Sequence, residues 1–134
     1  MRLAVLDRRG RPQIATLWFA YGDGFLWAVS HADAWLTRRL EEAPEVGFEI
    51  STGHAPYRGL RGQGTVSVLP EVGGARLDEL LARYGIAPAS RLARWLQSRR
   101  EAEWALRLAP SRATYWDFAA RMQPPQTAEA PHDA

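Results

Sequence analysis

The sequence predicts a mainly β protein, an antiparallel barrel of six to seven strands with short helices. The strongest evidence is a long alternating run over residues 57–70, whose packed side carries Leu60, Gly62, Gly64, Val66 and Val68. Period-two alternation is typical of a strand with one packed face. Glycines on that face predict a bend or a close approach of another group. Turn signals between the other apolar segments indicate antiparallel neighbours.

Three strands are expected before the long run, over residues 2–7, 13–21 and 25–30, joined by turns rich in glycine and proline. Asp33 then has the character of a helix N-cap. Leu36 and Leu40 are spaced for one helix face, and Pro44 ends the helix. A fourth strand is expected over residues 46–51.

Two helices and two strands are expected after the long run. The first helix, from Gly73 to Gly85, has an apolar stripe of Leu77, Leu80, Leu81 and Tyr84. The second follows Pro88, with its inward residues being Leu92, Trp95 and Leu96. Strands 103–109 and 112–118 are expected on either side of a turn at Pro110 and Ser111. This order predicts a barrel capped by helices, as one domain over residues 1–120, with a loose tail over 121–134.

Composition excludes several classes of function. Cysteine is absent, so no disulfide or thiolate chemistry is available. All 17 basic residues are arginine, which excludes a lysine Schiff base. The net charge is only +2 and the arginines are spread along the chain, so we expect no nucleic-acid partner. No apolar run is long enough to cross a membrane and no secretory signal is visible, so we expect a cytoplasmic protein with no membrane partner.

No constellation of side chains for catalysis or metal binding is visible. His31 and His54 have no carboxylate at a metal-ligand spacing. Ser30 and His31 are adjacent, and neighbouring side chains diverge, so they do not make a nucleophile–base pair. No glycine-rich phosphate loop is present. We therefore expect no catalytic side chain and no metal site.

An ordered series of segments resembles the pyridoxamine 5'-phosphate oxidase-like, FMN-binding split-barrel proteins. The segments are GRPQIATLWFAYGDGFLWAVS, VGFEIS, YRGLRGQGTVSVL and ALRLAPSRATYWDF, and the resemblance runs from Leu3 to about Phe118. It implies a homodimer of split barrels, in which each flavin lies in a groove between the two subunits.

The resemblance also implies roles for particular residues. The flavin ring would lie on backbone at Thr16, Leu17 and Trp18. The phosphate would be held by the Ser30 hydroxyl, the following helix and basic side chains, of which Arg38 is a candidate. The long strand would offer Arg58 and Arg61, both expected on the side away from the core, and Gln63. Trp116 would touch the flavin bound mainly by the other subunit, and Trp35 is a second candidate for an interface or ring contact.

The sequence departs from the family pattern at the phosphate site. The family commonly has Arg-Lys five and six residues after the strand hydroxyl, where this chain has Trp35 and Leu36. Arg38 and Arg39 follow, but consecutive helical residues point about 100° apart, so only one of them can face a phosphate. The C-terminal Arg-Leu-His-Asp-Arg motif of true pyridoxamine-phosphate oxidases is absent, which argues against the vitamin B6 reaction.

Several interpretations remain open at this point. Ser30 also suits a local cap, and the arginines of 38–39 and of the long strand also suit a solvated surface. The main hypothesis is an FMN-dependent oxidoreductase that transfers a hydride or electrons to a small molecule. The alternatives are a deazaflavin-dependent reductase, a split barrel that has lost flavin and acts as a binding module, and, with least support, a haem protein.

Overall fold

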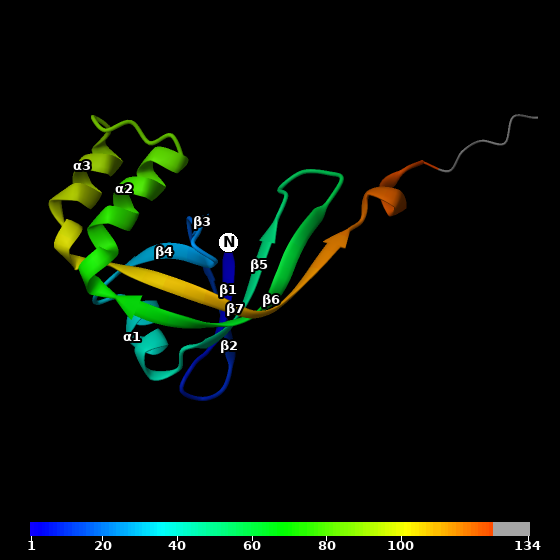
Figure 1. The fold of residues 1–134 in the computed structure, drawn as a ribbon, viewed down its shortest axis with the longest axis horizontal. Helices are drawn as coiled ribbons and strands as arrows, with labels where there is room; N and C mark the ends of the chain where they lie inside the picture. The colour runs from blue at the N-terminus through cyan, green and yellow to red at the C-terminus, as the bar shows by residue number, and fades with distance from the viewer. Residues whose placement is uncertain (125–134) are drawn as a thin grey trace, which may run out of the picture.

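A computed structural model describes residues 1–124, which form one antiparallel sheet of seven strands with three α-helices (Figure 1). The strands are β1 (Arg2–Leu6), β2 (Pro12–Thr16), β3 (Ala20–Gly22), β4 (Phe25–His31), β5 (Glu45–Ser51), β6 (Arg58–Leu69) and β7 (Glu103–Asp117). The helices are α1 (Trp35–Glu42), α2 (Gly73–Arg83) and α3 (Arg91–Ser98), and 3-10 turns cover Pro70–Val72, Arg100–Ala102 and Ala119–Met122. The strand order is β2-β1-β5-β6-β7-β4-β3. The predicted mainly β fold with short helices is confirmed.

The two edge strands of this sheet, β2 and β3, are consecutive along the chain. β2 pairs with β1, while β3 pairs with β4 at the other end of the order. A single strand over residues 13–21 was the wrong prediction, because the chain must cross from one edge of the curled sheet to the other. Three residues, 17–19, make that crossing outside both strands.

The protein has two apolar cores on opposite sides of the sheet. The first fills the curl of the sheet and is plugged by Leu36 and Leu40 of α1. The second lies under α2 and α3, where Leu77, Leu81 and Ala93 are buried. Each fully buried leucine contributes about 1.5–3 kcal/mol relative to exposure. The three leucines of the predicted α2 stripe are buried, as expected, whereas its fourth member, Tyr84, is 38% exposed.

Helix α3 differs from its prediction, because Leu92 and Trp95 are not inward. They are 41% and 53% exposed, and the buried residue of this helix is Ala93. The helix is the outermost layer and buries only a narrow face. Trp95 is instead covered by the Arg99 guanidinium, 4.0 Å from its ring centroid.

The predicted cap of α1 is also wrong. The helix begins at Trp35 after Ala34, and no side chain caps it. Asp33 lies one residue too early, and its carboxylate pairs with Arg38 at 2.6 Å. The helix is fixed to the sheet by Thr37, which is fully buried and donates to the His31 carbonyl at 2.7 Å.

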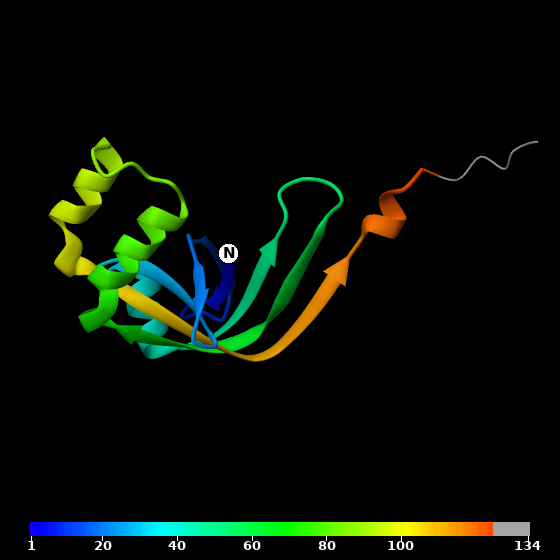
Figure 2. The same ribbon diagram turned by 45° about the horizontal axis from the view of Figure 1, so that its top comes forward.

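Strands β6 and β7 form a long arm that projects away from the helices (Figures 1 and 2). β7 is continuous through Pro110 and Ser111, so the predicted turn there is wrong. A register shift between Gln63 and Gly64 accommodates Ser111 as an extra residue, and bulges are among the places where sheets tolerate proline. At Gly62 a Cβ would lie 1.9 Å from the Arg112 carbonyl oxygen, so the two backbones approach too closely for any side chain.

The predicted tail begins with the 3-10 turn that ends at Met122, and residues 125–134 lie outside the described part of the chain. Within the described residues, no helix combines the length and the apolar character needed to cross a bilayer.

Candidate functional site

At residues 17–19, where contacts to a flavin ring are expected, the chain leaves the regular hydrogen bonding between strands. The Leu17 N–H donates to the Met1 carbonyl at 2.9 Å, and the Phe19 N–H donates to the Tyr84 hydroxyl at 3.1 Å. Among the described residues, none accepts a hydrogen bond from the Trp18 N–H. The Trp18 ring stacks on Tyr84, with centroids 5.3 Å apart and planes 20° apart. The segment is therefore held on both sides while one backbone donor stays uncommitted.

Thr16, Leu17 and Trp18 line a hollow of about 470 Å³ between this crossing and the helix pair, here called the helix-side hollow. Its walls are completed by Met1, Val29, Leu77, Tyr84, Leu96 and Glu103. The start of α2 comes very close to β7 here, because Gly73 has no Cβ to meet the Glu103 carbonyl oxygen, which would lie 1.8 Å away. The structure thus brings the three expected ring residues together with a buried carboxylate.

A second hollow, of about 390 Å³, lies between the β1–β2 turn and α1 and is here called the arginine hollow. It is lined by Asp7, Arg8, Arg9, Arg11, Trp35, Arg38, Arg39 and Glu42. Five arginines face two carboxylates, so its lining carries a net charge of +3. Two predicted residues, Trp35 and Arg38, meet here, and the turn supplies three further arginines that were not predicted.

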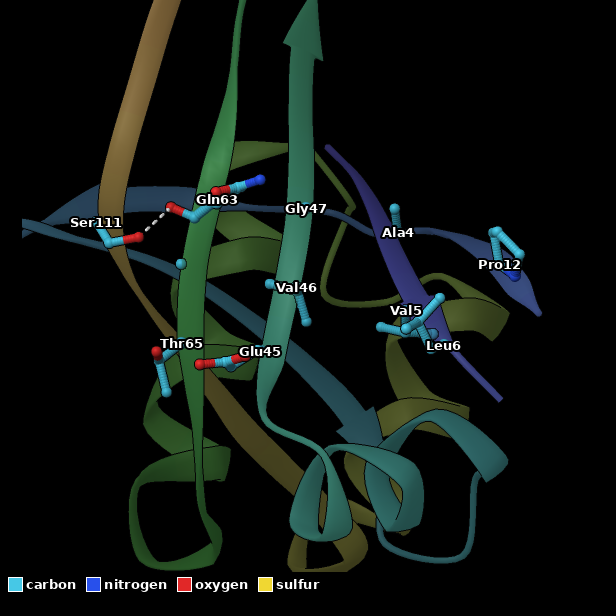
Figure 3. A pocket seen from close by; sticks show the side chains of 11 residues that line it. Ala4, Val5, Leu6, Pro12, Glu45, Val46, Gly47, Gln63, Thr65 and Ser111 are labelled. Atoms are coloured by element: carbon cyan, nitrogen blue, oxygen red, sulfur yellow. Dashed lines mark hydrogen bonds between the residues drawn. The ribbon is translucent and has the colours of Figure 1, made fainter. Parts of the chain in front are cut away.

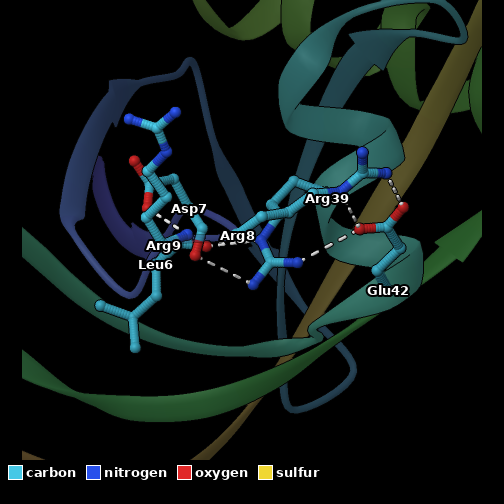
Figure 4. Close-up of polar contacts among 6 residues, drawn as sticks. All are labelled: Leu6, Asp7, Arg8, Arg9, Arg39 and Glu42. Carbon is cyan, nitrogen blue, oxygen red and sulfur yellow. Dashed lines mark hydrogen bonds and ion pairs between the residues drawn. The ribbon is translucent and has the colours of Figure 1, made fainter.

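Arg39 explains why the turn lies against the helix (Figure 4). Its side chain is only 15% exposed, and it donates to the carbonyls of Leu6 and Asp7 while pairing with Glu42 at 3.2 Å. Arg8 pairs with the same carboxylate, and its hydrogen bond is the main reason that the pKa of Glu42 is lowered. Arg9 is exposed, and among the described residues no acceptor pairs with its guanidinium.

The Asp7 carboxylate organises the turn itself. It accepts hydrogen bonds from the backbone N–H groups of Arg9 and Arg11 at 2.8 and 2.9 Å, and its pKa is lowered, chiefly by the Arg11 N–H. The Arg11 side chain also pairs with it at 3.1 Å. Asp7 is therefore satisfied locally, and within residues 1–124 it bonds Arg9 only at the backbone N–H and not at the guanidinium.

The other five predicted residues lie outside these two hollows; they are Ser30, Arg58, Arg61, Gln63 and Trp116. Arg58 and Arg61 are on opposite faces, because side chains three apart in a strand alternate. Their expected common position away from the core was wrong. Arg58 lines a hollow of about 500 Å³ with Leu60 and Tyr115, while Arg61 lies opposite Glu49 across the β5–β6 ladder.

Gln63 lines a fourth hollow, of about 480 Å³, on the outer face of the sheet (Figure 3), here called the sheet hollow. Its floor includes the small residues Ala4 and Gly47. The Gln63 carbonyl accepts from the Ser111 hydroxyl at 3.2 Å, which holds the bulge. Ser30 is half-buried in β4 opposite Trp104 and lines none of these hollows.

Trp116 lies opposite Gly59, where an added Cβ would be 2.9 Å from the indole. Phe118 is its aromatic neighbour, with centroids 4.9 Å apart. The indole Nε1 is enclosed and finds no hydrogen-bond partner among the described residues. A buried indole N–H usually finds an acceptor, so Trp116 has an unmet hydrogen-bonding requirement, as does the Arg107 Nε of the same strand.

The ten predicted residues therefore fall into separate places within one protomer. The ring residues line the helix-side hollow, Trp35 and Arg38 the arginine hollow, and Gln63 the sheet hollow. Sequence reasoning missed the arginines of the β1–β2 turn and Glu103. The run Arg8-Arg9-Gly10-Arg11 was a signal for the turn, whereas Glu103 at the start of a strand gave none.

Comparison with known proteins settles the fold. No protein-family model and no curated protein match the sequence. A conserved hypothetical protein of Mycobacterium tuberculosis superposes with a TM-score of 0.73 at 21% identity, over 97% of this chain and 84% of that one. An F420 reductase gives 0.71 at 23% identity, over 84% and 86% of the two chains.

A pyridoxamine 5'-phosphate oxidase-type protein from Listeria innocua gives a TM-score of 0.63 at 14% identity, over 85% of each chain. This chain has their split-barrel fold. The resemblance seen in the sequence is thereby confirmed at the level of fold, with solved structures that include flavin- and deazaflavin-related proteins.

Proposed function

We propose that this protein is an oxidoreductase that binds a flavin-type cofactor, FMN or a deazaflavin, and passes a hydride or electrons to a small molecule. The observation that carries the proposal is the geometry of β2, which joins the arginine hollow at one end to the uncommitted Trp18 N–H at the other. The solved structures of this fold support it, since they include an F420 reductase.

The arginine hollow suits the anionic end of such a cofactor. Guanidinium groups bind phosphate through paired N–H donors, and a net charge of +3 favours a dianion. Trp35 and Leu36 replace the basic pair of the family pattern, and Arg8, Arg9 and Arg11 supply basic groups from the turn instead. The site thus keeps its charge while taking it from a different segment.

The crossing at residues 17–19 suits the ring. The five residue steps from Arg11 to Thr16 span about 16 Å at about 3.3 Å each, which is the scale of a tricyclic ring joined to a phosphate by a short polyol. A backbone N–H directed at a ring nitrogen orients the ring and tunes its electrons, and the cofactor when bound supplies the redox chemistry itself. The chain's own task is to position, which agrees with the expectation of no catalytic side chain.

A second copy of the chain is part of the proposal. Ile14 is 66% exposed on the outer face of the sheet, and Leu6 and Pro12 line the neighbouring sheet hollow. Exposed apolar groups around a shallow floor are typical of an interface. Pairing of two such faces would bring Gln63 of one protomer and the arm of the other toward a shared cofactor. Sedimentation at micromolar concentration should give a dimer, and a monomer would refute this arrangement.

The test of the cofactor proposal is direct titration of the purified chain with FMN and with F420, followed by tryptophan quenching and cofactor absorbance. We expect one of the two to bind in the micromolar range. Arg9→Ala should weaken binding about ten- to a hundredfold, because a charged hydrogen bond contributes about 1.5–3 kcal/mol. Arg91→Ala, an exposed arginine on α3, is the matched control and should change nothing. Binding of neither cofactor below about millimolar concentration would refute the proposal.

A further inference from the structure

The helix-side hollow contains a carboxylate that nothing in the proposed function uses. Glu103 is 3% exposed, and its Oε1 accepts from the Arg99 Nε at 2.7 Å. Among the described residues, no donor is bonded to its other oxygen, Oε2. Two side-chain polar atoms, Arg107 Nε and Trp116 Nε1, are fully enclosed and have no partner among the described residues. Glu103 Oε2 is not one of them, so it is not fully enclosed. Glu103 therefore keeps one acceptor open toward the hollow that it lines.

Apart from Thr16 and Met1, the remaining walls of the hollow are apolar or aromatic. Leu17, Val29, Leu77 and Leu96 surround it, and the stacked rings of Trp18 and Tyr84 form one side. A volume of about 470 Å³ is in the range of small-molecule sites. Walls of this kind select a planar apolar body, and a single open carboxylate oxygen selects a hydrogen-bond donor on that body.

The charges around the hollow argue against a cationic ligand. Arg99 already neutralises Glu103, with a side chain that is itself one-third exposed. Met1 also lines the hollow, and its α-amino group donates to the Leu17 carbonyl at 3.0 Å. A second positive charge would therefore gain no net attraction, whereas a neutral O–H or N–H would complete the Glu103 hydrogen bonds.

We infer that the helix-side hollow is the substrate pocket and that it takes a neutral aromatic molecule bearing a hydroxyl or N–H donor, which Glu103 receives. The assignment as a substrate pocket rests on the proposed function, because Thr16, Leu17 and Trp18 border both this hollow and the expected position of the flavin ring. The binding preference itself belongs to the hollow and is measured without any cofactor.

The experiment compares 2-naphthol with 2-methoxynaphthalene, which has the same ring system without the donor, by calorimetric titration of the full chain. We expect 2-naphthol to bind at least tenfold more tightly. Glu103→Gln should reduce that ratio at least threefold, since an amide replaces the carboxyl group and accepts hydrogen bonds less strongly. Glu101→Gln removes an exposed carboxylate two residues away and should leave the ratio unchanged. Equal binding of the two ligands, or of neither, would overturn the inference.

A second pair of variants keeps the test independent of the Glu103–Arg99 ion pair. Leu96→Trp fills the hollow from α3 and should abolish 2-naphthol binding, while Leu92→Trp on the exposed face of the same helix should not. Circular dichroism checks that each variant is folded. Unchanged binding in Leu96→Trp would place the ligand elsewhere and overturn the inference.

Adding the cofactor separates this inference from the proposed function. With FMN or F420 bound, 2-naphthol affinity should stay within about threefold, because the two molecules are expected to be neighbours. Stoichiometric displacement of the cofactor by 2-naphthol would show that the hollow is the ring's own place and refute the substrate assignment. Selective binding of 2-naphthol by a chain that binds neither cofactor would refute the proposed function alone.

Discussion

Gly62 gives the sharpest test of the packing between β6 and β7. The perturbation is Gly62→Ala, which adds one methyl group at the point where the two backbones approach most closely. That Cβ would lie 1.9 Å from the Arg112 carbonyl oxygen, and real Cβ contacts essentially never fall below 3.0 Å. Because the obstacle is backbone, no side-chain rotation can relieve it, so the strands must part by about 1 Å.

The cost can be estimated from that separation. Ladder hydrogen bonds of about 2.9 Å would lengthen beyond their useful range, and one or two bonds beside Gly62 would be lost at about 1 kcal/mol each. Overpacking strain adds about 1–3 kcal/mol. The free energy of unfolding should therefore fall by about 3 kcal/mol.

Urea denaturation followed by tryptophan fluorescence measures this change. With a slope of about 1.5 kcal/mol per molar, the midpoint should drop by about 2 M. Gly53→Ala is the matched control, because nothing lies within 4 Å of its Cβ position and its φ is not positive. Its midpoint should stay the same or rise slightly. Equal midpoints for both variants would show that the close approach at Gly62 does not exist.

Three further outcomes are expected, two from buried contacts and one from a surface ion pair. Leu77→Ala should lower the free energy of unfolding by about 2–5 kcal/mol and Leu92→Ala by less than about 1 kcal/mol, because only the first side chain is enclosed; similar midpoints in urea would contradict this. Thr37→Val should cost about 1 kcal/mol, because it removes one of the two hydrogen bonds that the His31 carbonyl accepts and leaves the one from the Ala34 N–H; an unchanged thermal midpoint would show that the Thr37 bond is not made. The pKa of Asp78 is lowered, chiefly by the hydrogen bond from Arg100, so its stabilising effect is present above the ordinary value of about 4 and is lost as the pH falls below it. Asp78→Asn should accordingly lose less stability than the parent chain between pH 5 and pH 2, and parallel pH curves in thermal denaturation would refute the pairing.

The sequence predicted the architecture because its signals are local. Alternation along the long run and the leucine spacing of α2 report which side of an element is buried, and both were correct. The strand over residues 13–21 failed because the break at 17–19 is required by the closure of the sheet, which no local pattern encodes. Pro110 was read as a turn because proline usually ends a strand, whereas the bulge opposite Gln63 lets β7 continue.

The candidate site was predictable only where chain neighbours define it. Thr16, Leu17 and Trp18 are consecutive, so they could be placed together. Arg9 and Trp35 are brought to one hollow by α1 docking on the β1–β2 turn, which depends on the hydrogen bonds of Arg39 to that turn. Arg58 and Arg61 illustrate a simpler limit, since residues of unlike parity in a strand cannot share a face.

The two edge strands of the sheet, β2 and β3, follow one another in the chain. The short link at residues 17–19 therefore holds the two edges of the sheet near each other. Lengthening this link with a few flexible residues would let the two edge strands move apart, and each edge would then present free backbone N–H and C=O groups to other molecules. The short link thus disfavours strand pairing with other molecules at these two edges, and it also presents the Trp18 N–H.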